Sequence, residues 1–320
     1  MKRRKISGVI IFISFLIMSM NCFSQNALRP KNLEKKNSIF LETGELKATI
    51  VDNEAFGEKH RAGYNGLAEL YHSAQDSTPF VSLYAGFNLE HIFGGDSLES
   101  LFEPREHSMS LYQPSENSAL LYQSPTPLSN VESLTEFRFE APHYIDVTFR
   151  CSLRSDKFFK HNYAGLFWAS YIDSPEDKKI YFLGKTSTGD TARWIDAYSE
   201  RHGEKSTHTG IGEAHEFYFA PNFNARLASH FSGYHFIEPF YFGRFHNMVL
   251  VFMFDTDQVI RFSQSPTGGG QGNPAWDFQF LIPNPVVEKI YSYRARLVYK
   301  PFINREDVVE EYDTWKEGLE

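Results

Sequence analysis

Strict alternation of apolar and polar side chains marks the segment Ile145-Asp146-Val147-Thr148-Phe149-Arg150-Cys151. Successive residues of a β-strand point to opposite faces of a sheet, so this pattern predicts a strand with one buried face. Further strand-like segments separated by turn residues are predicted on both sides of it, at residues 38–42, 45–51, 66–72, 80–84, 119–123, 131–140, 143–153, 163–172, 179–183, 214–220, 248–255, 259–263, 276–282 and 289–299. Many short strands of this kind predict an all-β fold, a large antiparallel β-sandwich.

One segment near the C-terminus has the spacing of a helix. Asn304 is a good N-cap residue, and Glu306 with Asp307 favours the positive end of the helix dipole. Tyr312 and Trp315 then recur at helical spacing. We expect this helix to close the sandwich at its C-terminal end.

The first residues have the layout of a secretory signal peptide. A basic cluster, Lys2-Arg3-Arg4-Lys5, precedes the apolar run from Val9 to Met20, and small residues lie before a cut at Gln25. The apolar run is shorter than the roughly 20 residues that a membrane-spanning helix needs. The sequence therefore predicts export to the periplasm or beyond, and lipid attachment at Cys22 is the alternative.

This gives three predicted parts: a signal peptide at 1–24, a flexible lead at 25–37, and a single sandwich domain at 38–320. Removal of the four basic residues leaves 28 Lys and Arg against 40 Asp and Glu, a formal net charge of 28 − 40 = −12. An acidic protein repels phosphate backbones, so no nucleic-acid partner is expected. No later segment has the length of a membrane span, and Cys151 has no cysteine partner after cleavage.

No known metal or nucleotide motif is present. The adjacent pairs Glu90-His91 and His215-Glu216 are expected to point to opposite faces of their strands, so neither pair is predicted to hold an ion. The glycine-rich residues 263–274 lack the Lys-Ser/Thr that follows a phosphate-binding loop. No metal ligand and no organic cofactor are therefore predicted, although a divalent metal assembled from distant strands is left open.

Several loops mix His, Tyr, Arg and carboxylate side chains, the types needed for proton transfer next to an anionic sugar. Phe, Tyr and Trp make up 16% of residues, which suits both a β-core and the stacking of sugar rings. The predicted catalytic residues are His107, His202 and Tyr198. The predicted substrate-binding residues are His60, Arg61, Tyr64, Glu90, His91, Arg105, Trp168, Arg193 and Trp194.

Four segments carry a resemblance to a known family. The opening hairpin, residues 40–50, resembles the first hairpin of galactose-mutarotase-like β-supersandwich proteins. Residues 60–66, 165–172 and 273–280 are similar to segments of secreted proteins from polysaccharide-utilisation loci of marine Bacteroidota and Planctomycetes. The resemblance covers residues 38 to 317 and implies a supersandwich-like fold. It further implies an oligosaccharide dehydratase or lyase of the type used in ulvan breakdown.

Three functions follow. The leading one is a carbon–oxygen lyase or dehydratase that acts by β-elimination on uronic-acid-containing oligosaccharides. The second is a non-catalytic glycan-binding protein in which Trp168, Trp194 and Trp276 stack sugars, and the third is a glycoside hydrolase.

Overall fold

The computed structural model describes residues 28–186 and 189–319, so the predicted signal peptide lies outside the described residues. The N-terminal half contains β1 (Lys35–Lys36), β2 (Ser38–Thr43), β3 (Leu46–Val51), β4 (Gly66–His72), β5 (Asn88–Phe93), α1 (Glu103–Glu106), β6 (Met109–Ser115), β7 (Ser118–Gln123), β8 (Val131–Glu140) and β9 (Tyr144–Leu153). The C-terminal half contains β10 (Tyr163–Ala169), β11 (Ile180–Lys185), β12 (Arg193–Ala197), β13 (Thr207–Gly210), a 3-10 turn at Arg226–Ala228, β14 (Phe231–Phe236), β15 (Phe240–Phe245), β16 (Met248–Asp255), β17 (Val259–Ser265), β18 (Ala275–Pro283), β19 (Ile290–Pro301) and α2 (Arg305–Glu317).

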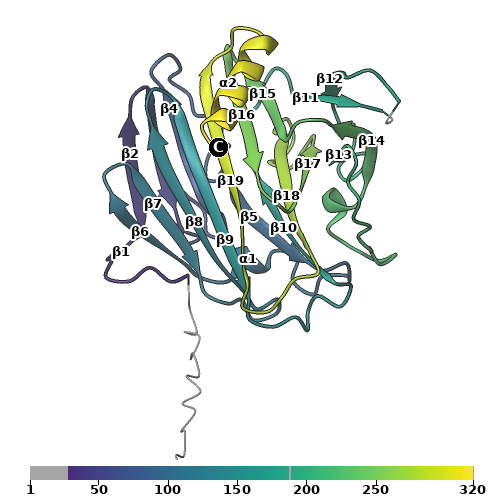
Figure 1. Ribbon diagram of the computed structural model, residues 1–320. Helices are drawn as coiled ribbons and strands as arrows, with labels where there is room; N and C mark the ends of the chain where they lie inside the picture. Colours follow the sequence, from purple (N-terminus) through teal and green to yellow (C-terminus); the bar gives the residue numbers. More distant parts are fainter. Residues whose placement is uncertain (1–27, 187–188, 320) are drawn as a thin grey trace, which may run out of the picture.

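The strands form a large, almost wholly antiparallel sheet and a smaller sheet of three strands. The large sheet runs β1-β6-β7-β8-β9-β19-β16-β15-β11-β14-β13-β17-β18-β10-β5, with β12 paired to β11, and the small sheet runs β2-β3-β4. The large sheet folds back on itself, because β5, β10, β18 and β17 lie behind β9, β19 and β16 (Figure 1). The predicted all-β sandwich is therefore confirmed.

The core between the two layers is rich in aromatic rings. Phe149 of β9 meets Trp168 of β10 edge to face, with ring centroids 4.8 Å apart, and Trp168 stacks on Phe278 of β18 at 5.0 Å. A Cβ atom on Gly243 of β15 would lie 2.3 Å from the ring of Trp276, so only glycine fits there. The high aromatic content thus fills the interior of the sandwich.

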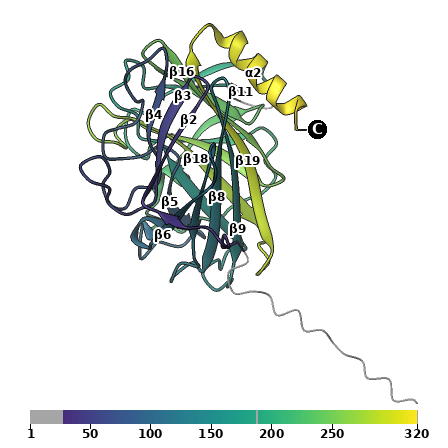
Figure 2. The ribbon, with the colours of Figure 1, turned by 90° about the vertical axis from the view of Figure 1, so that its left-hand side faces the viewer.

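The predicted C-terminal helix is confirmed as α2, which lies on the outside of the molecule (Figure 2). The side chain of Asn304 accepts a hydrogen bond from the backbone N–H of Asp307, as expected of an N-cap. Val308, Tyr312 and Trp315 are buried against β15, β16 and β19. The helix therefore covers one outer face of the large sheet.

Three local predictions differ from the structure. Within the predicted flexible lead, Lys35 and Lys36 pair with β6, and Leu28 is buried against Tyr112 and Tyr122. Residues 80–84 and 214–220 were expected to be strands, but neither forms one: Phe80 makes only an isolated bridge, and Phe217 packs from a loop. In both segments side chains pack on the protein interior, but the backbone pairs with neighbours only at single points, such as Val81 with Tyr171 and Ala220 with Gly95.

Neither helix among the described residues combines the length and apolar character needed to cross a bilayer.

Candidate functional site

A small cavity lies on the outer face of β5, β10 and β18, where loops cover the sheet. Its volume is about 160 Å³, room for about five water molecules at roughly 30 Å³ each. The residues around it come from distant parts of the chain: Glu90, His91, Leu101, Phe102, Ala169, Tyr171, His202, Asn224, Ala225, Arg226, Leu227, Gly268, Ala275 and Asp277. A second cavity carries the same kinds of group, at Glu213, His215, Glu216, His235 and Arg261, but its Arg261 is paired with Glu213.

A β-bulge places two adjacent residues of β5 in the first cavity. Leu89 pairs with Trp168 and His91 pairs with Phe167, so Glu90 is an extra residue between two successive pairs. Leu89 faces the core, while Glu90 and His91 both line the cavity. The expectation that Glu90 and His91 point to opposite faces is therefore wrong, because a bulge breaks the alternation and re-aims a side chain.

Glu90 is held by two donors. The hydroxyl of Tyr171 donates to its Oε1 at 2.8 Å, and Nη1 of Arg105 donates to the same oxygen at 3.3 Å. The side chains of Arg105 and Glu90 are only 13% and 10% exposed, so solvent screens this ion pair weakly. Arg105 also lies over the ring of Tyr64 at 3.9 Å and over that of Phe102 at 4.6 Å.

His91 is fixed in one tautomer. Its Nδ1 lies within hydrogen-bond distance of the backbone oxygen of Leu101, which can only accept, so Nδ1 carries the proton. Burial lowers the pKa of His91, which keeps the imidazole neutral near pH 7. Its Nε2 makes no hydrogen bond within the described chain, so it is available as a proton acceptor.

Asp277 differs from His91 in that its surroundings favour the protonated form of the side chain. It is fully buried, its Oδ1 accepts a hydrogen bond from the backbone N–H of Ser170, and its Oδ2 has no partner in the part of the chain that the structure describes. Burial, reinforced by the negative charge of Glu90, raises the pKa of Asp277 well above its ordinary value. The carboxyl group therefore keeps its proton to a higher pH than an ordinary aspartate does, which suits it to donate a proton.

His202 and Arg226 form the exposed side of the cavity. Nδ1 of His202 lies 2.9 Å from Oγ of Ser265 on β17. Burial of its ring lowers the pKa of His202, and the charge of Arg226 acts in the same direction. Arg226 belongs to the 3-10 turn that crosses the sheet, and its guanidinium is open to an anionic ligand.

The structure brings several predicted site residues together. Glu90, His91 and His202 line the cavity, and Arg105 and Tyr64 lie directly behind Glu90. Arg61 lies at the surface over the rings of Tyr64 and Tyr84, which stack on each other with centroids 4.3 Å apart. These residues form a continuous patch of aromatic and charged groups.

Other predicted site residues lie away from it. Trp168 is 1% exposed and stacks within the core, so it has no face for a sugar, and Trp276 of the glycan-binding alternative is equally buried. Trp194 packs with Phe242 and Arg305 beneath α2, and its neighbour Arg193 is exposed on β12. The burial of Trp168 and Trp276 contradicts sugar stacking, while Arg193 and Trp194 lie away from this cavity and stay predictions. Alternation predicts a strand without indicating what covers each of its faces.

The remaining predicted residues have local roles. Tyr198 is 45% exposed just after β12. His107 ends α1, and its backbone oxygen accepts hydrogen bonds from Asn53 and Gln123. His60 is buried and its Nε2 donates to the backbone oxygen of Tyr64 at 2.7 Å, so it shapes the loop that carries Tyr64.

The cavity residues that the sequence did not predict include Tyr171, Asp277 and Arg226, which carry ionisable groups. Tyr171 and Asp277 lie in two of the segments that carry the family resemblance, residues 165–172 and 273–280. An acidic residue inside the apolar strand Trp276–Ile282 was the available signal for Asp277, since an unpaired buried carboxyl is costly. Nothing in the sequence around Arg226 distinguishes it from a surface arginine.

Within the described ranges, one group of three side chains has donor atoms close enough to share an ion, and it lies elsewhere, at Glu45, His72 and His143. The cavity contains the carboxyl groups of Glu90 and Asp277 and the imidazoles of His91 and His202, which are groups that can transfer protons.

No family model and no curated protein matches this chain. Solved structures similar to it include a protein provisionally named an aldose 1-epimerase from Escherichia coli K12, with 7% identity, a TM-score of 0.49, and coverage of 84% of this chain and 100% of that one. A mutant of heparan sulfate lyase HepC from Pedobacter heparinus has 9% identity and a TM-score of 0.39 over 86% of this chain and 38% of that one. A 4-alpha-glucanotransferase from Thermococcus litoralis has 10% identity and a TM-score of 0.40 over 83% and 39%.

This chain spans about two fifths of the length of the two longer enzymes. At these TM-scores the similarities assign neither a family nor an activity.

Proposed function

We propose that this protein is a carbohydrate-active lyase or dehydratase that acts by β-elimination on uronic-acid-containing oligosaccharides. The observation that carries the proposal is that one cavity is lined by the imidazole of His91, whose pKa burial lowers, and by the carboxyl of Asp277, whose pKa burial raises. Groups whose environments push their protonation states apart are suited to act as base and acid in the same reaction.

The elimination needs three kinds of group, and the cavity offers each. Nε2 of His91 takes the proton on the carbon next to the substrate carboxylate, and the electron pair of that C–H bond forms the new double bond. The bond from the β-carbon to oxygen breaks, and Asp277 donates a proton to the departing oxygen. Arg226 neutralises the carboxylate and stabilises the charge that develops on it.

The site favours Arg226 over Arg105 for the neutralising role. Arg105 is committed to Glu90, whereas Arg226 is exposed and borders the cavity. Arg61, on the stacked rings of Tyr64 and Tyr84, is placed to contact a second sugar of an oligosaccharide.

Ultraviolet absorbance tests the proposal directly, because an unsaturated uronate absorbs where the substrate does not. We expect absorbance to rise when the protein meets uronate-containing oligosaccharides, and to rise at least tenfold more slowly with Arg226→Gln or His91→Gln. Arg201→Gln is the matched control, since Arg201 is an exposed arginine outside the cavity lining. No rise with a panel of such oligosaccharides would refute the lyase proposal.

A specific observation favours glycoside hydrolysis as the second candidate. Glu90 and Asp277 are two carboxyl groups around one cavity, and hydrolysis of a glycosidic bond uses such a pair. New reducing ends without ultraviolet absorbance would support this reaction, and binding of the same sugars without either change would support a non-catalytic glycan-binding role.

We also propose that the protein is exported. The basic and apolar residues at its start support cleavage before Gln25. Mass spectrometry of protein from the periplasm or medium should find an N-terminus at Gln25, and an intact Met1 would contradict export by cleavage.

A further inference from the structure

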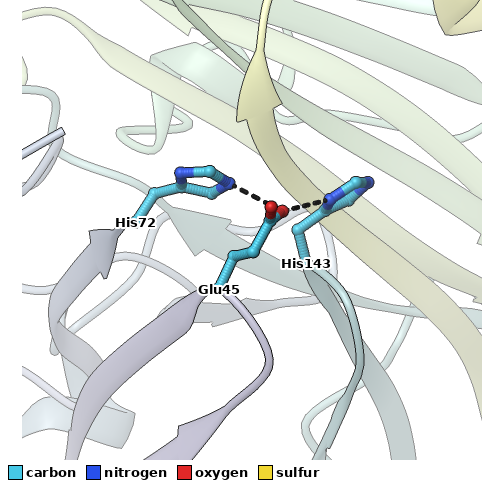
Figure 3. A group of neighbouring side chains, drawn as sticks. All are labelled: Glu45, His72 and His143. Carbon is cyan, nitrogen blue, oxygen red and sulfur yellow. Dashed lines mark hydrogen bonds and ion pairs between the residues drawn. The ribbon is translucent and has the colours of Figure 1, made fainter. Parts of the chain in front are cut away.

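Three side chains meet where the β2–β3 turn, the end of β4 and the turn before β9 come together: Glu45, His72 and His143 (Figure 3). Oε2 of Glu45 lies 2.9 Å from Nδ1 of His143 and 3.2 Å from Nε2 of His72. Their approach depends on Gly44, at φ 61°, because a Cβ atom there would lie 2.4 Å from the backbone oxygen of Pro142. The backbone N–H of Glu45 donates to that same oxygen at 2.7 Å.

A second carboxylate faces the other nitrogen of His143. Its Nε2 is buried without a hydrogen-bond partner and lies 3.6 Å from Oε1 of Glu311 on α2. Glu311 in turn accepts a hydrogen bond from the hydroxyl of Tyr144 and pairs with Lys300 of β19. His143 therefore lies between two carboxylates that belong to different parts of the fold.

The tautomer of His72 argues against a shared metal ion. Its Nδ1 accepts the backbone N–H of Ala74 at 3.0 Å, so the proton of the neutral ring is on Nε2 and points to Glu45. A metal on Nε2 would move that proton to Nδ1, where it would oppose the N–H of Ala74. A proton on His143, which gives both of its nitrogens an N–H to donate, fits the two carboxylates better.

We propose that His143 is a proton-operated latch that fastens the small sheet β2-β3-β4 to the large sheet and to α2. When doubly protonated, its ring bridges Glu45 of the small sheet and Glu311 of α2. When it loses a proton, one of the two contacts loses its donor and the bridge opens.

The charges around His143 define the pH range of the latch. Burial works against the charged ring, but Glu311 and Glu45 outweigh it and raise the pKa of His143 above 6.5, against a smaller opposing effect of Lys300. Contact with His143 lowers the pKa of Glu45, and the pKa of Glu311 lies at about 2 because His143 and Lys300 outweigh its burial. Burial lowers the pKa of His72, which stays the neutral member.

The sign of the pH dependence follows from these directions. A histidine whose pKa is raised on folding contributes its full stability below 6.5, and that stability is lost as the pH rises through the raised value. A glutamate whose pKa is lowered on folding, as that of Glu45 is, contributes its full stability at pH values above its ordinary pKa of 4.5. The latch is therefore strongest between about pH 4.5 and 6.5 and weakens at higher pH.

The position of the latch connects it to the candidate site. Glu45 directly precedes β3 and His72 ends β4, and the opposite ends of these two strands, Val51 and Gly66, are joined by the loop that carries Arg61 and Tyr64. Release of the latch would loosen the sheet that positions this rim of the cavity. The latch itself does not depend on which reaction the cavity catalyses.

Thermal denaturation across pH tests the proposal with His143→Gln. We expect the Tm difference from the unsubstituted protein to be largest between about pH 4.5 and 6.5 and to shrink above that range. The matched control is His246→Gln, because His246 makes an equally short contact of 2.7 Å with Glu176, but the two side chains are 39% and 69% exposed. An ion pair between exposed side chains contributes little to the free energy of unfolding, so His246→Gln should leave Tm unchanged.

Imidazole NMR gives a second readout that does not depend on the variant's stability. In the unsubstituted protein, His143 should titrate above pH 6.5, and Glu45→Gln should shift its titration downward. Titration at or below 6.5, or a Tm difference that is constant with pH, would overturn the proposal. A stoichiometric rise in Tm on addition of Zn²⁺, absent from His143→Gln, would also overturn it in favour of a metal site.

Discussion

Arg105 is predicted to stabilise the fold mainly by neutralising Glu90. Arg105→Met keeps an aliphatic side chain of similar length, but removes the guanidinium that lies over Tyr64 and Phe102, together with its charge and its hydrogen bond to the backbone oxygen of Gly63. Glu90 then keeps only the hydroxyl of Tyr171 as a donor, in a site where its side chain is 10% exposed. Removing one partner of a buried ion pair costs about 3 to 5 kcal/mol. Because the Tyr171 bond survives, we expect a loss near the lower limit, about 3 kcal/mol, or more than a hundredfold in the folding equilibrium.

Urea denaturation followed by circular dichroism measures this loss, with the slope against urea expected to stay constant. The double variant Glu90→Gln/Arg105→Met should recover part of it, since no unpaired charge is then buried. Arg294→Met is the control: Arg294 pairs with Asp255 but is 50% exposed, so its loss should cost less than about 1 kcal/mol. The reasoning fails if Arg105→Met costs no more than that control, or if the double variant loses the sum of both single changes.

Three further predictions concern burial and packing. Burial raises the pKa of Asp277 well above 3.8, so at a pH above 3.8 the folded state holds a proton that the unfolded state has released. The free energy of unfolding should then fall by about 1.4 kcal/mol for each pH unit until the raised pKa is reached. Asp277→Asn should remove this contribution from thermal denaturation measured upward from about pH 4, and an unchanged slope would contradict the prediction. Gly243→Ala should cost about 1 to 3 kcal/mol, because its Cβ would meet Trp276 at 2.3 Å, whereas Gly189→Ala, with nothing within 4 Å, should leave Tm unaltered. Asn304→Ala should destabilise the protein by about 1 kcal/mol through loss of the α2 cap, and a Tm equal to that of the unsubstituted chain would show the cap to be dispensable.

The strands most clearly predictable from sequence are those whose pattern agrees with their environment. β8 and β16 were predicted with the bounds observed, because their apolar side chains face the core and their ends coincide with turns. β5 was missed, because Asn88, Glu90 and His91 are buried polar residues that hide the apolar pattern. β13 and β14 were also missed, since polar and glycine residues interrupt them.

The candidate site was predictable only as a set of residue types. Loops rich in His, Arg and Tyr suggested Arg61, Tyr64 and Arg105, and the structure places these three residues together, next to Glu90. What covers each face of a strand depends on loops that return from far along the chain, as Arg226 and His202 do. The periodicity of a strand does not indicate which distant segment will cover it. The sequence therefore did not show that Trp168 is buried in the core or that Trp194 packs against Phe242 and Arg305.

Because Glu90 is the extra residue of the β5 bulge, it does not occupy the position of any residue that pairs with β10. If Glu90 were deleted, Leu89 would still pair with Trp168 and His91 with Phe167, and each would keep its present face. A single-codon insertion or deletion could thus add or remove the carboxylate of Glu90, while His91 and Asp277 keep their places on the sheet. In this fold, gain or loss of the acidic group is separable from the inheritance of the scaffold.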